Sequence, residues 1–273
     1  MDAMTNRTDA ELSRDVAQEA GRLLLDLRAS FGPIDDKDTA NALRKQADQA
    51  SHVRLMELLT AARPHDAILS EEGKDDAARL DAERVWILDP LDGTYEYGQG
   101  RADFAVHVAL WQPAGSILSA CTVDLPAQGL TRSVLDEVDA PAGLPVDRPV
   151  RIVASRSRPP ATLGATVERL AALLDEAGVA HLGVEVIDVG SVGAKVNEIL
   201  SGRADAYVHD TGFYEWDVAA PYGVAAHYGL VPSHLDGSAV TFNHMPPYVT
   251  DLMVSRPALA GPLRTALRES TAS

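Results

Sequence analysis

The stretch Val85–Thr94, which reads Val-Trp-Ile-Leu-Asp-Pro-Leu-Asp-Gly-Thr, constrains this chain more than any other. Its apolar first part, residues 85–88, is typical of a buried strand. A proline follows Asp89, and because proline cannot donate a hydrogen bond to a neighbouring strand, we expect the strand to end there. The sequence thus predicts a buried strand that leads into a turn rich in carboxylates.

That turn carries the groups needed to hold a metal and an anion side by side. Asp89 and Asp92 can converge on one hard cation, with the carbonyl of Leu91 as a third oxygen ligand. If a helix starts after the turn, the amides of Gly93 and Thr94 can hold an anion. A metal beside a phosphate is the layout of metal-assisted phosphoryl chemistry. Taken alone, however, the same residues are equally typical of a surface loop between strands.

Composition limits the class of protein. With 273 residues, of which 46% are hydrophobic, the chain can form a full core in one large or two medium domains. The net charge of -16 argues against nonspecific binding to nucleic acid, which requires many basic side chains on phosphates. Cys121 is the only cysteine, so neither a disulfide framework nor a cysteine zinc site is expected. The apolar runs are too short for a membrane span and the first residues do not resemble a secretory signal, so we expect a cytoplasmic protein.

Hydrophobic periodicity gives an outline of the elements. It predicts helices over residues 9–28, 50–62, 163–177, 191–201, 218–228 and 257–269, and strands over 66–70, 85–88, 104–111, 119–125, 150–154, 184–189, 205–209 and 249–255. We expect residues 34–45 to form a loop, and 112–115 to turn between two antiparallel strands. Prolines and glycines in 138–149 predict a boundary between an α+β domain (1–145) and an α/β domain (146–273).

Four acidic residues stand at the end of a predicted strand or at the start of a predicted helix. They are Glu71, Asp89, Asp92 and Asp217. Considered singly, Asp217 is more typical of a helix cap, and Glu71 of a solvated charge pair with Glu72. No cysteine or histidine pair accompanies them, and ligation by oxygen alone favours Mg²⁺ or Mn²⁺ over zinc.

Three motifs in a fixed order reinforce this interpretation: Ser-Glu-Glu at 70–72, Trp-Ile-Leu-Asp-Pro-Leu-Asp-Gly-Thr at 86–94, and Glu-Trp-Asp-Val-Ala-Ala at 215–220. The series resembles the inositol monophosphatase family of magnesium-dependent, lithium-sensitive phosphatases, over about residues 12–263. The resemblance implies an α/β fold built as a layered αβαβα sandwich. The active site would lie between the two domains, which is a common place for a ligand.

The resemblance also implies the metal ligands. Glu71, Asp89 and the Leu91 carbonyl match one site, and Asp89, Asp92 and Asp217 match a second. A third, weaker ion would share Glu71 with waters. We therefore expect two or three Mg²⁺ ions, with Mn²⁺ as a substitute and with Li⁺ and Ca²⁺ as inhibitors.

Two further residues match the family's catalytic pair. Asp48 corresponds to the aspartate that pairs with the signature threonine, here Thr94. In the family this pair aims a water that the metal activates, and a second metal neutralises the leaving oxygen. The resemblance places Gly93 and Thr94 at the scissile phosphate.

The details favour the branch of CysQ-type 3'(2'),5'-bisphosphate nucleotidases. The features that resemble this branch are Thr-Tyr-Glu-Tyr at 94–97, Ser-Arg-Ser at 155–157, Gly-Ser at 190–191 with Lys195, and Glu215. They imply that Ser191, Lys195 and Arg156 bind substrate, although such basic residues are about equally typical of a solvated surface. Several nucleotidases carry an arginine where this chain has His209-Asp210, so we expect the contacts with the second phosphate to differ from those in these nucleotidases.

The predicted reaction is hydrolysis of the 3'-phosphate of adenosine 3',5'-bisphosphate to AMP and phosphate. An inositol 1-phosphatase or a sugar phosphatase acting on fructose 1,6-bisphosphate is the first alternative. A non-catalytic phosphate sensor is the second, against which Asp48 and Thr94 argue. We expect a small phosphorylated partner but neither a nucleic acid polymer nor a membrane. Dimers are usual in the inositol monophosphatases, but no residue here decides. His107 and His244 are interpreted as structural or surface residues.

Overall fold

The computed structural model describes residues 2–141 and 143–271. The described part leaves out Met1, Ala142 and residues 272–273. Residues 1 and 273 are ends of the two predicted domains, and Ala142 belongs to their predicted boundary. The helices are α1 (Asp2–Thr5), α2 (Asp9–Phe31), α3 (Lys37–Ala62), α4 (Thr94–Gly98), α5 (Leu163–Glu176), α6 (Val192–Leu200), α7 (Glu215–His227) and α8 (Pro257–Thr271), with short 3-10 turns η1 (Ala77–Asp81), η2 (Pro113–Gly115) and η3 (Pro126–Gln128). The strands are β1 (Ala67–Ser70), β2 (Val85–Asp92), β3 (Ala105–Gln112), β4 (Ile117–Leu125), β5 (Leu130–Ser133), β6 (Val150–Ser155), β7 (Val184–Val189), β8 (Ala206–His209), β9 (Phe213–Tyr214), β10 (Val231–Ser233), β11 (Tyr248–Val249) and β12 (Leu252–Ser255).

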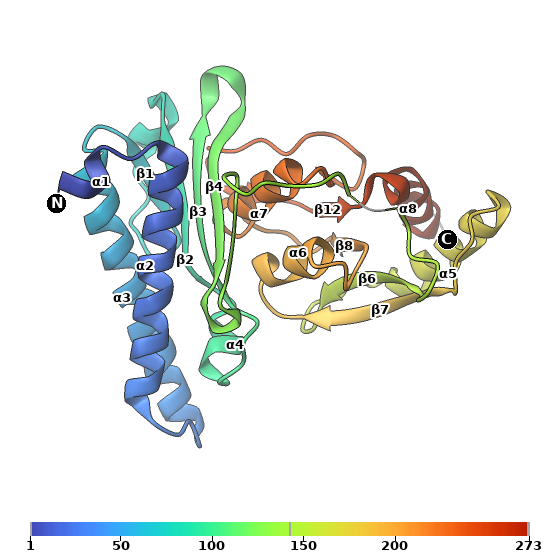
Figure 1. Cartoon of the computed structure of the whole chain (residues 1–273), viewed down its shortest axis with the longest axis horizontal. Helices are drawn as coiled ribbons and strands as arrows, with labels where there is room; N and C mark the ends of the chain where they lie inside the picture. Colours follow the sequence, from blue (N-terminus) through green and yellow to red (C-terminus); the bar gives the residue numbers. More distant parts are fainter. Residues whose placement is uncertain (1, 142, 272–273) are drawn as a thin grey trace.

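The elements form five layers (Figure 1). Helices α2 and α3 cover one face of a sheet with the strand order β1-β2-β3-β4-β5. Helices α6 and α7 lie between the other face and a second sheet with the order β10-β12-β8-β6-β7, and α5 and α8 cover the outer face of that sheet. The predicted αβαβα sandwich is therefore confirmed.

The central strands are apolar on both faces because helices cover both faces. All residues of β2 are buried. Trp86 and Leu88 pack toward α2 and α3, whereas Val85 and Ile87 pack toward α7. A strand sandwiched in this way loses the usual alternation of polar and apolar residues, which explains the uninterrupted apolar run in the sequence.

One predicted strand end was wrong. Strand β2 does not stop before Pro90 but continues to Asp92. Its pairing with β3 shifts between Asp89, which faces His107, and Asp92, which faces Ala105. The two intervening residues oppose one residue of β3, so a β-bulge accommodates the proline and turns the carboxylates toward the middle of the molecule.

Residues 34–45, predicted as a loop, are mostly helical. Helix α3 starts at Lys37, and the side chain of Asp36 caps it by accepting a hydrogen bond of 2.8 Å from the Thr39 amide. Ala40 and Leu43 are buried against the first layer's core, so tertiary packing stabilises a helical turn that looks too polar in sequence. Asp48 consequently lies in the middle of a helix, not before one.

The last predicted strand, 249–255, is two strands in different sheets. Residues 248–249 pair with β9, whereas Leu252–Ser255 pair with β8 and β10. Helix α7 begins at Glu215, three residues before its predicted start, and the short strands β5, β9 and β10 were not predicted. The pairings of β9 with β11 and of β10 with β12 join residues distant in sequence, which local periodicity does not report.

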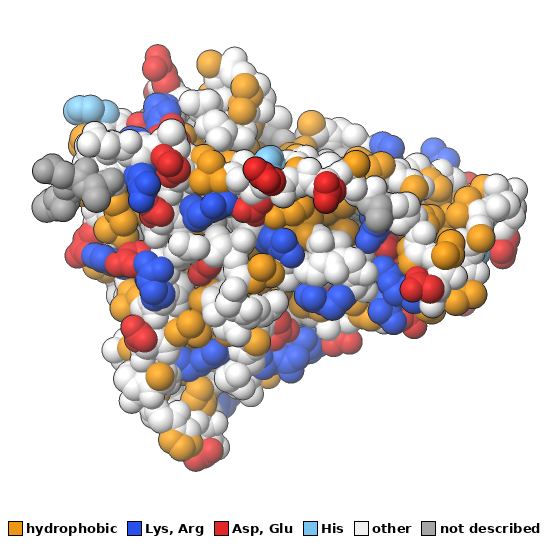
Figure 2. Space-filling view, viewed as in Figure 1, with side chains coloured by type: hydrophobic (Ala, Val, Ile, Leu, Met, Phe, Trp, Pro, Cys, Tyr) orange, Lys and Arg blue, Asp and Glu red, His pale blue; other side chains and the backbone are white. Residues whose placement is uncertain are grey.

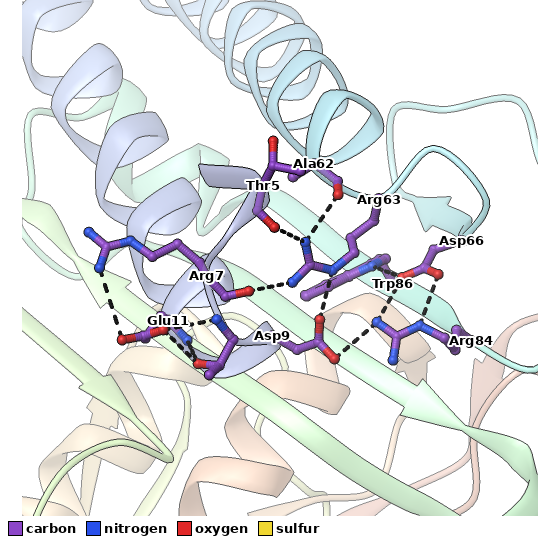
Figure 3. A network of polar contacts seen from close by, with 10 residues as sticks. Thr5, Arg7, Asp9, Glu11, Ala62, Arg63, Asp66, Arg84 and Trp86 are labelled. Carbon is purple, nitrogen blue, oxygen red and sulfur yellow. Dashed lines mark hydrogen bonds and ion pairs between the residues drawn. The ribbon is translucent and has the colours of Figure 1, made fainter. Parts of the chain in front are cut away.

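A network of charged residues joins the first layer to the sheet (Figure 3). Asp9 of α2 accepts hydrogen bonds from Arg63, at the end of α3, and from Arg84, just before β2. Arg84 also pairs with Asp66, which accepts a hydrogen bond of 2.8 Å from the Trp86 indole. The network holds the start of β2 against both helices.

Among the described residues, no helix is long and apolar enough to cross a membrane. Basic and acidic side chains are mixed over the face seen in Figure 2.

Candidate active site

The structure brings three predicted metal ligands together at the end of β2. Oxygens of Asp89, Asp92 and Asp217 lie within 4.8 Å of one another. Asp89 and Asp92 come from the bulged end of the strand, and Asp217 from the first turn of α7, where it also accepts a 2.9 Å hydrogen bond from the Tyr214 amide. The helix-capping role expected of Asp217 on its own therefore coexists with a place in the acidic cluster.

Glu71 lines the same cavity as the three-acid cluster and comes from the neighbouring strand. It follows β1, which runs parallel to β2, and its amide donates a hydrogen bond of 3.3 Å to the Leu88 carbonyl. Desolvation in the cavity wall and then the nearby Asp217 raise the pKa of Glu71 to about 8. Burial and the other three acids raise the pKa of Asp89 well above its usual value.

These residues suit a hard cation. The Oδ2 atom of Asp89 is buried and has no hydrogen-bond partner within residues 2–141 and 143–271, so it lacks the compensation that a buried oxygen normally requires. Clustered carboxylates repel one another unless a positive charge lies between them. Because all the donors are oxygens, including the Leu91 carbonyl on the same cavity wall, the site fits a divalent metal of the magnesium type.

The clustered acids give the first prediction. Desolvation and neighbouring carboxylates raise the pKa of Glu71 to about 8, and desolvation and Asp92 raise that of Asp217 to about 7. Without metal, these two groups bind more protons in the folded protein than in the unfolded chain above pH 4, so their contribution to stability falls as pH rises toward 8. We expect the Tm of the metal-free protein to fall from pH 5 to pH 8, and added MgCl₂ to raise Tm more at pH 8 than at pH 5. Calorimetry at several pH values measures this, and an Mg²⁺ effect independent of pH would contradict it.

Asp48 and Thr94 meet beside the cluster. The Thr94 hydroxyl lies 3.3 Å from Oδ1 of Asp48 and 3.0 Å from the Leu91 carbonyl. Burial and the charge of Glu72 raise the pKa of Asp48 to about 7, while the hydrogen bond from Thr94 and the charge of Arg44 oppose this rise. A carboxyl with this pKa can accept a proton at neutral pH.

Gly93 connects the acids to the rest of the cavity wall. Its φ of 87° lies in the left-handed region. A Cβ at this position would lie 3.1 Å from the Asp103 carbonyl and 3.2 Å from Cβ of Ser191. Only glycine therefore allows the turn to approach the loop before α6 so closely, and this approach places Gly93 and Thr94 on the cavity wall.

The acids open into a cavity of about 270 Å³, which is large enough for a small molecule. Its far wall comes from the second sheet and the loops around it. The residues of that wall are Ser155, Arg156, Ser157, Arg158, Gly190, Ser191, Val192, Lys195, Tyr207, His209 and Phe213. The cavity thus combines a carboxylate-lined end with a wall that carries three basic side chains.

Ser191 and Lys195, which we predicted to bind substrate, both donate hydrogen bonds to groups within the protein. Ser191 donates a hydrogen bond of 2.6 Å to Oδ2 of Asp92, so its hydroxyl orients a carboxylate of the cluster. Lys195 is buried, its Nζ donates to the Gly190 carbonyl, and it lies 5.4 Å from the centre of the Tyr207 ring. Burial lowers the pKa of Lys195 to about 8, so near neutral pH it remains mainly a cation beside the cavity.

Arg156 reaches the cavity but is already engaged. Its three guanidinium nitrogens lie 2.9 Å from Glu96, 2.9 Å from Asp103 and 3.2 Å from Asp188. Arg158 lines the same cavity, and its side chain makes no ion pair in the described part of the chain within 4.0 Å. A phosphate in the cavity would meet Arg158 without having to displace carboxylates, whereas the contact predicted for Arg156 would require that displacement.

Two buried groups near the acidic cluster were not assigned a place in the site from the sequence. His107, which we interpreted as structural or surface, lies between Asp92 and the backbone of α7. Tyr207 lines the cavity, and its hydroxyl is buried without a hydrogen-bond partner among the described residues. The pairing of β2 with β3, which places His107 opposite Asp89, is the signal that would have revealed the first.

Comparison with known proteins gives consistent results. The inositol monophosphatase family model matches residues 6–271. A Mycobacterium leprae protein named 3'-phosphoadenosine 5'-phosphate phosphatase is 40% identical over 279 residues, covering 98% of this chain and 96% of that protein. The 3'(2'),5'-bisphosphate nucleotidase CysQ of Escherichia coli K12 is 28% identical, covering 77% and 84%. The structure of CysQ from Bacteroides thetaiotaomicron has a TM-score of 0.69 at 23% identity, covering 90% of this chain and 96% of that one, which supports the fold.

Proposed function

This chain belongs to the inositol monophosphatase family, and from this membership we propose that it is a magnesium-dependent phosphatase that hydrolyses the 3'-phosphate of adenosine 3',5'-bisphosphate. The products are AMP and phosphate. The observation that carries the chemistry is the meeting of Asp89, Asp92 and Asp217 within 4.8 Å, beside the Asp48–Thr94 pair. The named substrate of a relative that is 40% identical supports the choice of substrate.

The metal ligands divide into two sets. Glu71, Asp89 and the Leu91 carbonyl would hold one ion, Asp89, Asp92 and Asp217 a second, and a third would share Glu71. When bound, such ions make a water more acidic and neutralise negative charge on the departing oxygen. Mg²⁺ as the native ion, Mn²⁺ as its substitute and inhibition by Li⁺ and Ca²⁺ are parts of this proposal.

The residues of the chain orient the reactants. The Thr94 hydroxyl lies within hydrogen-bond distance of Asp48 and of the Leu91 carbonyl, and when it donates its hydrogen bond to Asp48 its oxygen lone pairs can accept one from an attacking water. Asp48 lies where it can accept the proton that this water loses, and burial raises its pKa above the usual range of an aspartate. The backbone at Gly93 and Thr94 faces the cavity, where the scissile phosphate would lie. Holding water and phosphate in this arrangement removes much of the entropic barrier.

A substrate panel tests the proposal. We expect kcat/KM for adenosine 3',5'-bisphosphate to exceed that for inositol 1-phosphate and fructose 1,6-bisphosphate. The far wall contains Lys195 and Arg158, which can pair with a second phosphate on a nucleotide. A clear preference for inositol 1-phosphate would instead support the inositol monophosphatase alternative.

Lys195→Met sharpens the test because methionine keeps much of the apolar stem and removes the charge. Loss of one charged hydrogen bond to the second phosphate is worth about 1.5–3 kcal/mol, so kcat/KM for the bisphosphate should fall roughly tenfold to 150-fold. A monophosphate substrate is the control and should be nearly unaffected. Equal losses on both substrates would show that Lys195 does not bind the second phosphate.

The cytoplasmic location and a homodimeric state remain predictions. Cell fractionation and light scattering of the purified protein measure them.

A further inference from the structure

His107 lies between Asp92, which comes from the first sheet, and the start of α7, which carries Asp217. It is on β3, opposite Asp89 in the register with β2, and it is fully buried. Its Nε2 atom approaches Oδ2 of Asp92 to 3.2 Å but makes no hydrogen bond within the described part of the chain. Its Nδ1 atom is 3.3 Å from the carbonyl of Trp216, the residue before Asp217. One ring therefore contacts a carboxylate from the first sheet and the backbone that carries a carboxylate from α7.

Helix α6 leaves space for the His107 ring at Gly193. A Cβ on Gly193 of α6 would lie 2.5 Å from Nε2 of His107, so a side chain there would collide with the ring. The Gly193 amide also donates a hydrogen bond of 3.0 Å to the same oxygen of Asp92. Helix α6 thus comes close enough to fix Asp92 only because residue 193 is a glycine.

We propose that His107 is a positioning residue for the metal ion held by Asp92 and Asp217. Its two nitrogens face opposite sides, so the ring sets the distance between Asp92 and the start of α7. Without this brace, repulsion between the carboxylates would separate the two ligands before the metal arrives. Groups that orient metal ligands in this way commonly affect metal affinity by about 10–100-fold. The inference rests on the proposed function only in that the cluster binds divalent metal.

Two conservative variants separate the contacts. The amide nitrogen of asparagine lies as far from Cβ as Nδ1 of histidine, and that of glutamine as far as Nε2. His107→Asn can therefore keep the contact with the Trp216 carbonyl, and His107→Gln can keep the contact with Asp92. His107→Ala loses both.

The experiment measures Mn²⁺ binding to the full-length metal-free protein by electron paramagnetic resonance titration. In His107→Ala we expect one of the Mn²⁺ sites to weaken by about 10–100-fold, while another keeps its affinity. His107→Asn and His107→Gln should both fall between His107→Ala and the wild type. His227→Ala is the matched control, because His227 also contacts a backbone carbonyl, that of Asp136 at 2.9 Å, but makes no ion pair with the acidic cluster among the described residues.

The outcomes are distinct. Wild-type Mn²⁺ binding by a folded His107→Ala, or Asn and Gln variants no better than Ala, would overturn the proposal. If His107→Ala does not fold, the Asn and Gln variants decide: an equal weakening of all sites would mean that His107 only stabilises the fold. Because no nucleotide is used, a wild-type protein that binds Mn²⁺ but does not hydrolyse the bisphosphate would refute the proposed function and leave this inference standing.

Discussion

Asp89→Asn is expected to lower kcat/KM by about a thousandfold or more, equivalent to about 4 kcal/mol of transition-state stabilisation. Asp89 is the one residue proposed to contact both principal metal ions, so its charge supports two sites at once. Asparagine has the same shape and can keep the 3.0 Å hydrogen bond from the Leu91 amide to Oδ1. The loss would therefore come from charge and not from collapse of the turn.

The stability of the metal-free protein provides the control for this variant. Because burial and three neighbouring acids raise the pKa of Asp89, the metal-free variant should be at least as stable as the metal-free wild type at pH 8. EDTA should abolish turnover by the wild type and added Mg²⁺ should restore it, whereas Mg²⁺ should rescue the variant only weakly. Wild-type turnover in Asp89→Asn would refute the ligand assignment, and turnover unaffected by EDTA would refute metal dependence.

Asp48→Asn is expected to reduce kcat by about 10²–10⁴-fold. The carboxylate of Asp48 accepts the Thr94 hydroxyl 3.3 Å away, and an asparagine can still accept that bond but cannot take up a proton. Metal affinity should remain close to that of the wild type, since Asp48 lies on α3 outside the three-acid cluster. Single-turnover kinetics together with Mn²⁺ titration would measure both quantities.

A double-mutant cycle shows whether the pair acts as a unit. Thr94→Val keeps the shape of the side chain and removes the hydroxyl, so it should cost about as much as Asp48→Asn. The double variant should be little worse than either single variant, because both break the same arrangement. Fully additive losses would mean that the two residues act separately and that the proposed proton route is wrong.

Much of the fold could be predicted from local patterns. The helix predicted over residues 9–28 is present as α2, and a capping box in which Thr8 and Glu11 exchange hydrogen bonds stands at its start. The antiparallel pair β3 and β4 was also predicted and is confirmed. These features need only neighbouring residues or a short turn, so periodicity and caps are sufficient to reveal them.

The errors share a physical cause. Residues 37–45 are helical because Leu43 is buried against residues that are distant in sequence. Strand β2 continues beyond Pro90 because a β-bulge in its pairing with β3 accommodates the proline. The tail 248–255 divides because its two parts meet different partners. In each case a contact between segments far apart in sequence outweighs the local preference of the residues.

By itself the sequence indicated most of the helices and strands and their order, because short-range periodicity reports them. It also indicated the candidate acidic ligands and the class of metal that oxygen ligands suit, because these depend on residue chemistry. Only the tertiary structure decided that Arg156 is engaged by three carboxylates while Arg158 faces the cavity, that Ser191 holds Asp92, and that His107 joins β3 to α7. Such roles depend on strand register and on the angle at which helices approach the sheet. Both are set by the packing of the whole core, in which a shift of one residue would turn His107 to the opposite face.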